Sequence, residues 1–176
     1  QSYFIMVIKT KFKDLVIIQN KKHKDKRGYF QEIFSQKQLK RKFIFTVMSY
    51  SKKNVMRGLH IQTKKSQGKI VSVLKGMIFD VAVDLRKNSK TFGKVFSCIL
   101  SEKNSKSLYI PSGFAHGFLT LSKENFVTYS CTNLRHSISE TTIKYDDETL
   151  KIKWPKKKMI ISNKDRKGIS FLDYKK

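Results

Sequence analysis

Short segments rich in β-branched and aromatic residues recur along this chain, and they limit the folds open to it. Turn-forming residues separate them, and helical periodicity is weak throughout, although the short basic, polar segment 35–42 suggests one or two helical turns. Strands at intervals of about ten residues, with turn signals between them, are typical of a β-sandwich or β-barrel. With 176 residues and no internal repeat or low-complexity linker, we expect one domain over residues 1–176. The strand-like segments are 3–19, 43–50, 70–74, 77–85, 92–100, 108–110 and 126–132.

Residues 70–85 allow a more detailed prediction. The turn Lys75-Gly76 between two strand-like runs predicts a β-hairpin. In the second run one face is apolar, whereas the other face carries Asp80 and Asp84. We therefore expect the second strand to be half-buried, with its carboxylates away from the core.

The formal net charge is +25, from 38 Lys and Arg against 13 Asp and Glu. A charge of this size is compatible with binding to nucleic acid or an anionic membrane. The lysines are spread along the chain, however, and no nucleic-acid-binding motif accompanies them. We favour a solvated, lysine-rich surface, and we expect neither a nucleic acid nor a membrane as partner.

Three features of the sequence bear on the cellular compartment of the protein. No stretch reaches the roughly 18 apolar residues of a membrane helix, and the start of the chain lacks the apolar run of a signal peptide. Cys98 and Cys131 lie in apolar, strand-like settings, which favours free thiols in a reducing compartment. We expect a soluble cytoplasmic protein, with Met6 as the native start and residues 1–5 as an addition.

The segment Arg57-Gly58-Leu59-His60 combines groups suited to chemistry on a charged ligand. The guanidinium of Arg57 matches phosphate oxygens in pairs, and His60 can transfer a proton near neutral pH. Lys69 can place a positive charge beside a developing oxyanion. A regular strand would point Arg57 and His60 to opposite faces unless Gly58 bends it. The set suggests chemistry on a phosphorylated or nucleotide-linked carbonyl compound, and a solvated edge strand is the alternative.

The motif Pro111-x-Gly113-x-x-His116 resembles the second half of a cupin signature, in which a Pro-Gly turn sets a histidine inside a small β-barrel. Metal-binding cupins have a second histidine where this chain has Gln62, and no glutamate follows here before residue 70. Two histidines without a carboxylate make a poor site for a catalytic divalent metal. We expect an all-β, cupin-like jelly-roll barrel with short flanking helical segments, which works without metal or other cofactor.

Several long motifs stand in the order typical of one family. On these motifs, the chain resembles the dTDP-4-dehydrorhamnose 3,5-epimerase family of sugar-nucleotide epimerases over about residues 7–166. The resemblance implies inversion at C3, C5 or both of a nucleoside-diphosphate 4-keto sugar, in surface polysaccharide biosynthesis. The motifs are Asp25-x-Arg27-Gly28, Arg57-Gly58-Leu59-His60-x-Gln62, 79–86, Thr91-Phe92-Gly93, 110–118 and Ile152-x-Trp154-Pro155.

The resemblance also implies roles for single residues. His60 would be the base, Asp165 its partner, Lys69 the group that stabilises the enolate, and Tyr129 the acid on the far face of the sugar. The family works as a dimer, which implies a homodimer in which part of the nucleotide contact comes from the neighbouring subunit. The residues implied to contact the nucleotide or the sugar are Arg57, Lys164, Gln62, His116, Arg27, Phe30 and Glu32.

Two segments depart from the family pattern. Phe45 and Val47 stand where the family usually has Gln and Asn, and Leu134 and Arg135 stand where it usually has two tyrosines. Arg135 would add charge beside the sugar. These departures leave open the nucleotide (dTDP or GDP), the sugar (hexose or heptose) and the number of inverted carbons. A 3,4-ketoisomerase on the same scaffold and a non-catalytic basic module for polyanions are the alternatives.

Overall fold

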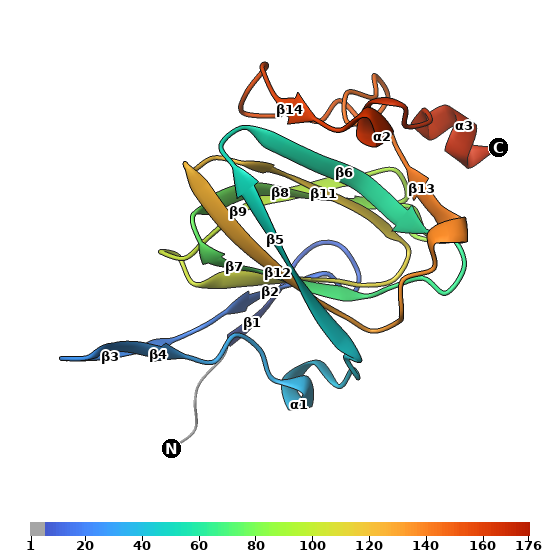
Figure 1. Ribbon diagram of the computed structural model, residues 1–176. Helices are drawn as coiled ribbons and strands as arrows, with labels where there is room; N and C mark the ends of the chain where they lie inside the picture. The colour runs from blue at the N-terminus through green and yellow to red at the C-terminus, as the bar shows by residue number, and fades with distance from the viewer. Residues whose placement is uncertain (1–5) are drawn as a thin grey trace.

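Two β-sheets packed face to face form the body of the protein in a computed structural model that describes residues 6–176 (Figure 1). The all-β jelly-roll prediction is confirmed, whereas the predicted addition at residues 1–5 lies outside the described residues. From edge to edge, the first sheet consists of β1 (Met6–Lys9), β2 (Val16–Gln19), β10 (Lys106–Ile110), β7 (Lys69–Lys75), β12 (Glu124–Cys131) and β5 (Phe45–Lys52). The second sheet consists of β13 (Glu140–Thr142), β6 (Val55–Gln62), β11 (Phe114–Thr120), β8 (Met77–Asp84) and β9 (Val95–Ser101).

Smaller elements surround the two sheets. The hairpin of β3 (Lys22–Asp25) and β4 (Gly28–Gln31) projects from the barrel (Figure 1). Strand β14 (Ile160–Ile161) pairs in parallel with β6. No helix among residues 6–176 has the length and hydrophobicity needed to cross a membrane. The helical elements are α1 (Gln36–Leu39), the 3-10 helix η1 (Ser137–Ser139), α2 (Asn163–Arg166) and α3 (Phe171–Lys175).

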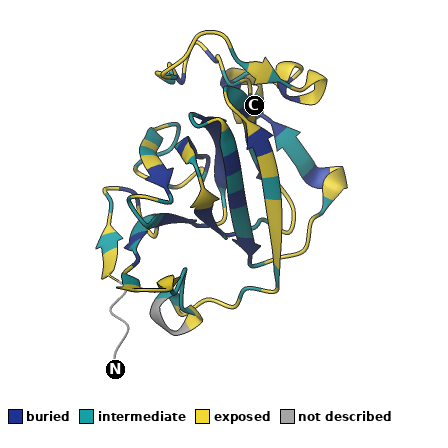
Figure 2. Cartoon of the chain, turned by 60° about the vertical axis from the view of Figure 1, so that its left-hand side comes forward, coloured by how far each residue is buried: buried dark blue, intermediate teal, exposed yellow. Residues whose placement is uncertain are grey.

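The second sheet is buried on both faces, so the half-buried strand predicted for residues 77–85 is wrong. Apolar residues of β8 such as Ile78 pack between the two sheets, whereas Val81 and Val83 pack outward against the C-terminal segment, through residues such as Phe171. That segment lies across β6 (Figure 1), and the central strands are largely buried (Figure 2). The face of β8 that carries the carboxylates is therefore the one turned toward the first sheet.

The predicted hairpin at residues 70–85 is also wrong, because β7 and β8 belong to different sheets. Strand β7 pairs with β10 and β12, and β8 pairs with β9 and β11. At the corner between them, Gly76 has a φ of +89°, and a Cβ atom there would lie 2.3 Å from the carbonyl oxygen of Glu124. Only glycine fits this corner. A turn signal predicts a reversal of direction, but it does not tell which sheet receives the next strand.

Candidate active site

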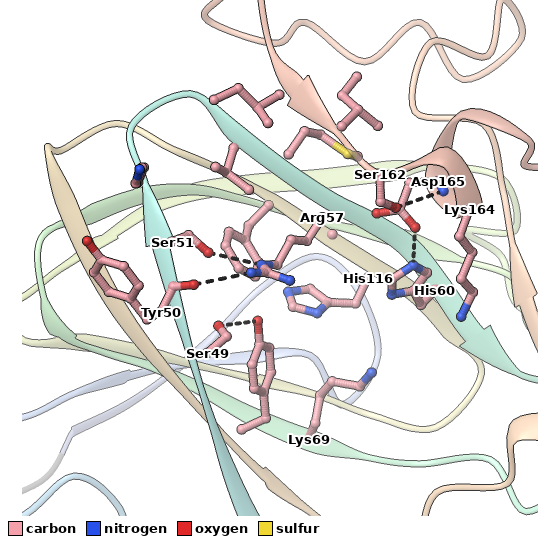
Figure 3. Close-up of a pocket in the computed structure, with 18 residues that line it drawn as sticks. Ser49, Tyr50, Ser51, Arg57, His60, Lys69, His116, Ser162, Lys164 and Asp165 are labelled. Carbon is pink, nitrogen blue, oxygen red and sulfur yellow. Dashed lines mark hydrogen bonds and ion pairs between the residues drawn. The ribbon is translucent and has the colours of Figure 1, made fainter.

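A cavity of about 770 Å³ lies between the sheets and brings the predicted catalytic residues together (Figure 3). We refer to it as the first cavity. Strand β6 and helix α2 line one side of it, and strands β5, β7 and β12 line the other. Its charged or titratable lining residues are Tyr50, Lys52, Arg57, His60, Lys69, His116, Tyr129, Lys164 and Asp165.

A one-residue bulge in β6 allows Arg57 and His60 to line the same cavity. His116 of β11 pairs with His60, but two residues later Phe118 pairs with Arg57, so β6 contains one residue more than β11 over this stretch. Gly58 lies at the bulge with a φ of +118°, and a Cβ atom there would lie 2.5 Å from the Cα atom of Gly117. The bend that the sequence required at Gly58 is thus present, and it is a β-bulge.

His60 and Asp165 form a hydrogen-bonded pair at the edge of the first cavity (Figure 3). Nε2 of His60 lies 2.6 Å from Oδ1 of Asp165, while Oδ2 accepts a hydrogen bond from the backbone of Gly58 at 3.2 Å. Burial alone would raise the pKa of Asp165, but the hydrogen bonds from His60, Gly58 and Ser162 outweigh it and the pKa is lowered. An ionised carboxylate only accepts, so Nε2 of His60 is the donor in this contact, and in a neutral imidazole Nδ1 is then the acceptor nitrogen.

The opposite wall supplies a phenol and an ammonium group. Tyr129 on β12 lies in the first sheet, and its hydroxyl is 3.4 Å from the Ser49 hydroxyl on β5. Burial raises the pKa of Tyr129, so the phenol keeps its proton throughout the neutral range. Lys69 opens β7 in the same sheet, and burial lowers its pKa, although Cys131, Asp80 and Glu140 act in the other direction. The cavity thus has an imidazole on the side of the second sheet and a protonated phenol on the side of the first sheet.

A second histidine–carboxylate pair lies deeper, and the sequence did not predict it. Nε2 of His116 is 2.8 Å from Oδ2 of Asp80, and the exposed fractions of the two side chains are 5% and 0%. Among the described residues, Oδ1 of Asp80 has no hydrogen-bond partner. His116 lines the first cavity, as the sequence indicated. The alternation of residues along β8 placed Asp80 and Val81 on opposite faces of the strand. That alternation alone could not show that the Asp80 face points into the barrel.

Arg57 is held by residues of the neighbouring strand β5. Its Nε donates to the hydroxyl of Ser51 at 3.0 Å, and NH2 donates to the carbonyl oxygen of Tyr50 at 3.2 Å (Figure 3). These bonds fix the guanidinium in the first cavity. Ser49 and Ser51 were not singled out from the sequence, because serines in a strand carry no distinctive signal.

A smaller second cavity, of about 370 Å³, opens from the same centre. It shares His60, Lys69, Tyr129 and Lys164 with the first cavity. Three of the four residues that depart from the family pattern, Phe45, Val47 and Arg135, line this second cavity. Its other lining residues are Phe45, Val47, Ile61, Gln62, Gln67, Cys131, Arg135 and Glu140.

Three predicted binding residues lie away from both cavities, and a fourth, Gln62, lines the second cavity but bonds the backbone of neighbouring loops. The amide of Gln62 bonds the backbone of three residues, at Lys65, Leu134 and His136, so its polar atoms are already used. Arg27, Phe30 and Glu32 lie on or next to the β3–β4 hairpin and line neither cavity. Arg27 forms an ion pair with Asp25 at 2.6 Å.

The described residues also bear on metal binding and on the thiols. No group of three or more His, Cys, Asp or Glu side chains within residues 6–176 is arranged to hold a metal ion. Cys98 and Cys131 are free thiols, as predicted. The side chains that line both cavities are the imidazole of His60, which pairs with Asp165, the phenol of Tyr129 and the ammonium groups of Lys69 and Lys164.

The sequence profile described as dTDP-4-dehydrorhamnose 3,5-epimerase matches residues 9–173. The chain belongs to the dTDP-4-dehydrorhamnose 3,5-epimerase family. An enzyme of this name from Methanothermobacter thermautotrophicus is 46% identical over 167 residues, which cover 90% of this chain and 90% of the relative.

Solved structures of the dTDP-4-dehydrorhamnose 3,5-epimerase family superpose closely on this fold. The epimerase from Legionella pneumophila, in complex with dTDP-4-keto-L-rhamnose, has a TM-score of 0.91 and 41% identity and covers 95% of this chain and 93% of its own. The epimerase from Bacillus anthracis, with TDP and pyrophosphate bound, has a TM-score of 0.92 and 36% identity and covers 96% of this chain and 100% of its own. The family predicted from the sequence motifs is confirmed.

Proposed function

We propose that this protein inverts C3 and C5 of a dTDP-linked 4-keto-6-deoxyhexose by removing and returning protons. The observation that carries the proposal is the arrangement of His60 with Asp165 on one sheet side and Tyr129 with Lys69 on the other, around one cavity. Relatives over nearly the whole chain bear the same enzyme name, and one of them holds a dTDP-4-keto sugar.

In the first step, Nδ1 of His60 takes a proton from the carbon next to the C4 carbonyl. The C–H electron pair forms the C=C bond of an enolate, and the carbonyl π pair moves to O4. Lys69 stabilises the negative charge that develops on O4. Asp165 holds the imidazole by its Nε2–H and stabilises the imidazolium that forms.

In the second step, the enolate carbon receives a proton on the opposite face. Tyr129 belongs to the facing sheet, and its raised pKa keeps it in the protonated, donating form. The phenolate that remains recovers a proton from the imidazolium or from solvent, which restores both groups for the second carbon. His60 and Tyr129 thus provide a proton acceptor and a proton donor on the two sides of the cavity. His116 and Arg57 line the same cavity, where the sugar and its phosphate would lie.

We propose further that the protein is a homodimer. The β3–β4 hairpin carries the exposed residues Tyr29 and Phe30, and it extends away from the cavities of its own chain (Figure 1). We propose that Arg27, Phe30 and Glu32 reach the nucleotide in a second copy of the chain. An aromatic ring next to an arginine suits the stacking and charge of a nucleotide.

A proton-exchange assay in deuterium oxide tests the proposed function. With dTDP-4-keto-6-deoxyglucose as substrate, we expect deuterium at C3 and C5 and inversion of both centres, measured by NMR. A parallel assay with a GDP-linked 4-keto sugar measures the choice of nucleotide. Absence of exchange at both carbons would refute the epimerase. Exchange accompanied by movement of the keto group would identify a 3,4-ketoisomerase, and exchange at one carbon would identify a mono-epimerase.

A further inference from the structure

Two hollows with cationic walls adjoin at Arg86, which lines both of them. Neither hollow shares a lining residue with the first or second cavity. One of them, which we call the lysine hollow, has a volume of about 490 Å³, and its charged lining residues are Lys11, Lys13, Arg86 and Lys90. The other, which we call the tyrosine hollow, has a volume of about 470 Å³ and is lined by Tyr109. Its charged lining residues are Asp14, Arg41, Lys42 and Arg86.

Arg86 is fixed between the two hollows. Nε and NH2 of its guanidinium donate to the two oxygens of Asp84 at 2.9 and 2.7 Å, and NH1 donates to the carbonyl oxygen of Lys13 at 3.1 Å. The guanidinium also lies over the ring of Phe114, 4.6 Å from the ring centre. The Asp84 carboxylate is buried, and it balances the charge of Arg86. Arg86 is therefore a rigid donor, and the attraction for an anion comes from the other five cations against Asp14.

The lysines of the two hollows have no carboxylate partner within residues 6–176. All four are exposed, and none of them belongs to an ion pair formed by the described residues. By contrast, the exposed Lys75 is paired with Glu124 at 2.7 Å. Unpaired charges of one sign that lie close together create a positive potential, which favours the binding of an anion among them.

We propose that the lysine hollow and the tyrosine hollow together bind a linear oligophosphate, outside the catalytic cavity. A single phosphate would occupy one hollow, whereas a chain of linked phosphates contacts cations in both and passes the guanidinium of Arg86. The amide of Asn88 lines the lysine hollow and adds an uncharged donor. Inorganic oligophosphate and the triphosphate of a nucleotide share this chemistry. The lysine-rich surface expected from the sequence thus includes a shaped site with a ligand of its own, which the epimerase reaction does not use.

Calorimetric titration with inorganic tripolyphosphate tests the site, with dTDP present at saturation to occupy the catalytic cavity. We expect one tripolyphosphate to bind per chain, and orthophosphate to bind at least about tenfold more weakly, because it contacts one hollow only. The triple variant Lys11→Gln/Lys13→Gln/Lys90→Gln is expected to bind tripolyphosphate about tenfold more weakly, since each exposed charge contributes a modest part of the affinity.

The lysine run at residues 156–158 provides a matched control. Lys156→Gln/Lys157→Gln/Lys158→Gln removes the same charge from exposed positions that line neither hollow and neither cavity. It is expected to bind tripolyphosphate within about twofold of the unaltered protein, because distant exposed charges are screened by salt. Both triple variants are expected to retain the kcat of the unaltered protein, which shows that they are folded.

A parallel titration with ATP identifies the source of the phosphates. Binding of ATP at least as tightly as tripolyphosphate would support the site and assign it to a nucleotide triphosphate. Weaker binding of ATP would support the site and assign it to free oligophosphate, because the nucleoside then finds no favourable contact.

Four outcomes would overturn the inference. Equal losses of affinity in the two triple variants would show a general attraction to a basic surface rather than a site. Competition between tripolyphosphate and dTDP would place the phosphates in the catalytic cavity. Equal affinity for orthophosphate and tripolyphosphate would exclude a chain of phosphates as the ligand, and absence of tripolyphosphate binding would exclude the site altogether. None of these outcomes affects the proposed function, because the substituted lysines line neither cavity.

Discussion

The barrel contains two histidine–carboxylate pairs with nearly the same geometry and different surroundings. His60 and Asp165 are 2.6 Å apart, and His116 and Asp80 are 2.8 Å apart. The two histidines are cross-strand neighbours on β6 and β11. The His60 side chain is 33% exposed, whereas that of His116 is 5% exposed. A proton-transferring group needs access to its substrate, and a group that shapes a cavity needs rigid support.

The two carboxylates of these pairs also come from different parts of the fold. Asp80 lies on β8, directly beside β11, so the fold of the second sheet alone places it near His116. Asp165 lies on α2, 105 residues from His60 in the sequence, and its position depends on the C-terminal segment packing over the sheet. The deep pair therefore belongs to the barrel itself, whereas the accessible pair is completed by the segment that covers it.

Matched substitution of the two histidines gives the largest expected effect. His60→Gln is expected to lower kcat by about 10³-fold, because glutamine cannot take up a proton as a base. His116→Gln is expected to lower kcat/KM by about tenfold, because it alters the cavity wall and leaves the base in place. Steady-state kinetics with dTDP-4-keto-6-deoxyglucose measures both. Equal losses in kcat would show that the two pairs share the proton transfer.

Matched substitution of the two carboxylates sharpens the comparison. Asp165→Asn is expected to lower kcat by about 10²-fold at an unchanged KM, since it removes the charge that stabilises the imidazolium and does not touch the sugar. Asp80→Asn is expected to change kcat by less than about tenfold, because it affects only how His116 is held. A rise in KM for Asp165→Asn, with kcat intact, would contradict this assignment. Unaltered dTDP affinity serves as the control for folding.

Asp84 provides a reference carboxylate that takes no part in either pair. Burial alone would raise its pKa, but hydrogen bonds from Arg86, Ser89 and Thr91 lower it to about 2. Because the folded-state pKa lies below the unfolded value, the stabilisation is complete above the unfolded pKa and is lost as the pH falls through about 2. We expect the free energy of unfolding to fall by about 2 kcal/mol between pH 5 and pH 2 through this group.

Chemical denaturation across this pH range measures the effect of Asp84. Asp84→Asn is expected to be less stable at neutral pH and to lose about 2 kcal/mol less on acidification than the unaltered protein. The same acid dependence in both proteins would show that Asp84 does not contribute. Activity at neutral pH should change little, because Asp84 lines neither cavity.

The sequence allowed the family and the β-rich fold to be predicted, because long motifs in a fixed order identify both together, and the same motifs named residues that the structure brings together around one cavity. It did not allow strand partners to be predicted, since Lys75-Gly76 fits a hairpin and a corner between sheets equally well. The burial of Asp80 was missed for a related reason. Whether the face of a strand meets water or another layer depends on residues far away in the sequence. Here the C-terminal residues Leu150 and Phe171 cover the face of β8 that carries Val81 and Val83, and the Asp80 face is turned toward the first sheet.

The contacts of Gln62 show a second limit of prediction from the sequence. A family motif places Gln62 two residues after His60, which predicts a contact with substrate. Gln62 lines the second cavity, and its amide also bonds backbone groups of three residues. A motif reveals that a residue type is needed at a position. It does not distinguish contact with a ligand from support of a neighbouring loop, because both leave the same residue in the sequence.

The glycine contact between β6 and β11 also has a consequence for protein design. Gly58 and Gly117 approach so closely that neither position has room for a Cβ atom, and this approach accompanies the bulge that turns Arg57 and His60 toward one cavity. Anyone who grafts this constellation onto another β-barrel must therefore transfer two strands with both glycines, rather than a list of side chains. Without the bulge, the three-residue spacing between positions 57 and 60 would point the two side chains to opposite faces, so the bulge is as much a part of the site as the functional groups.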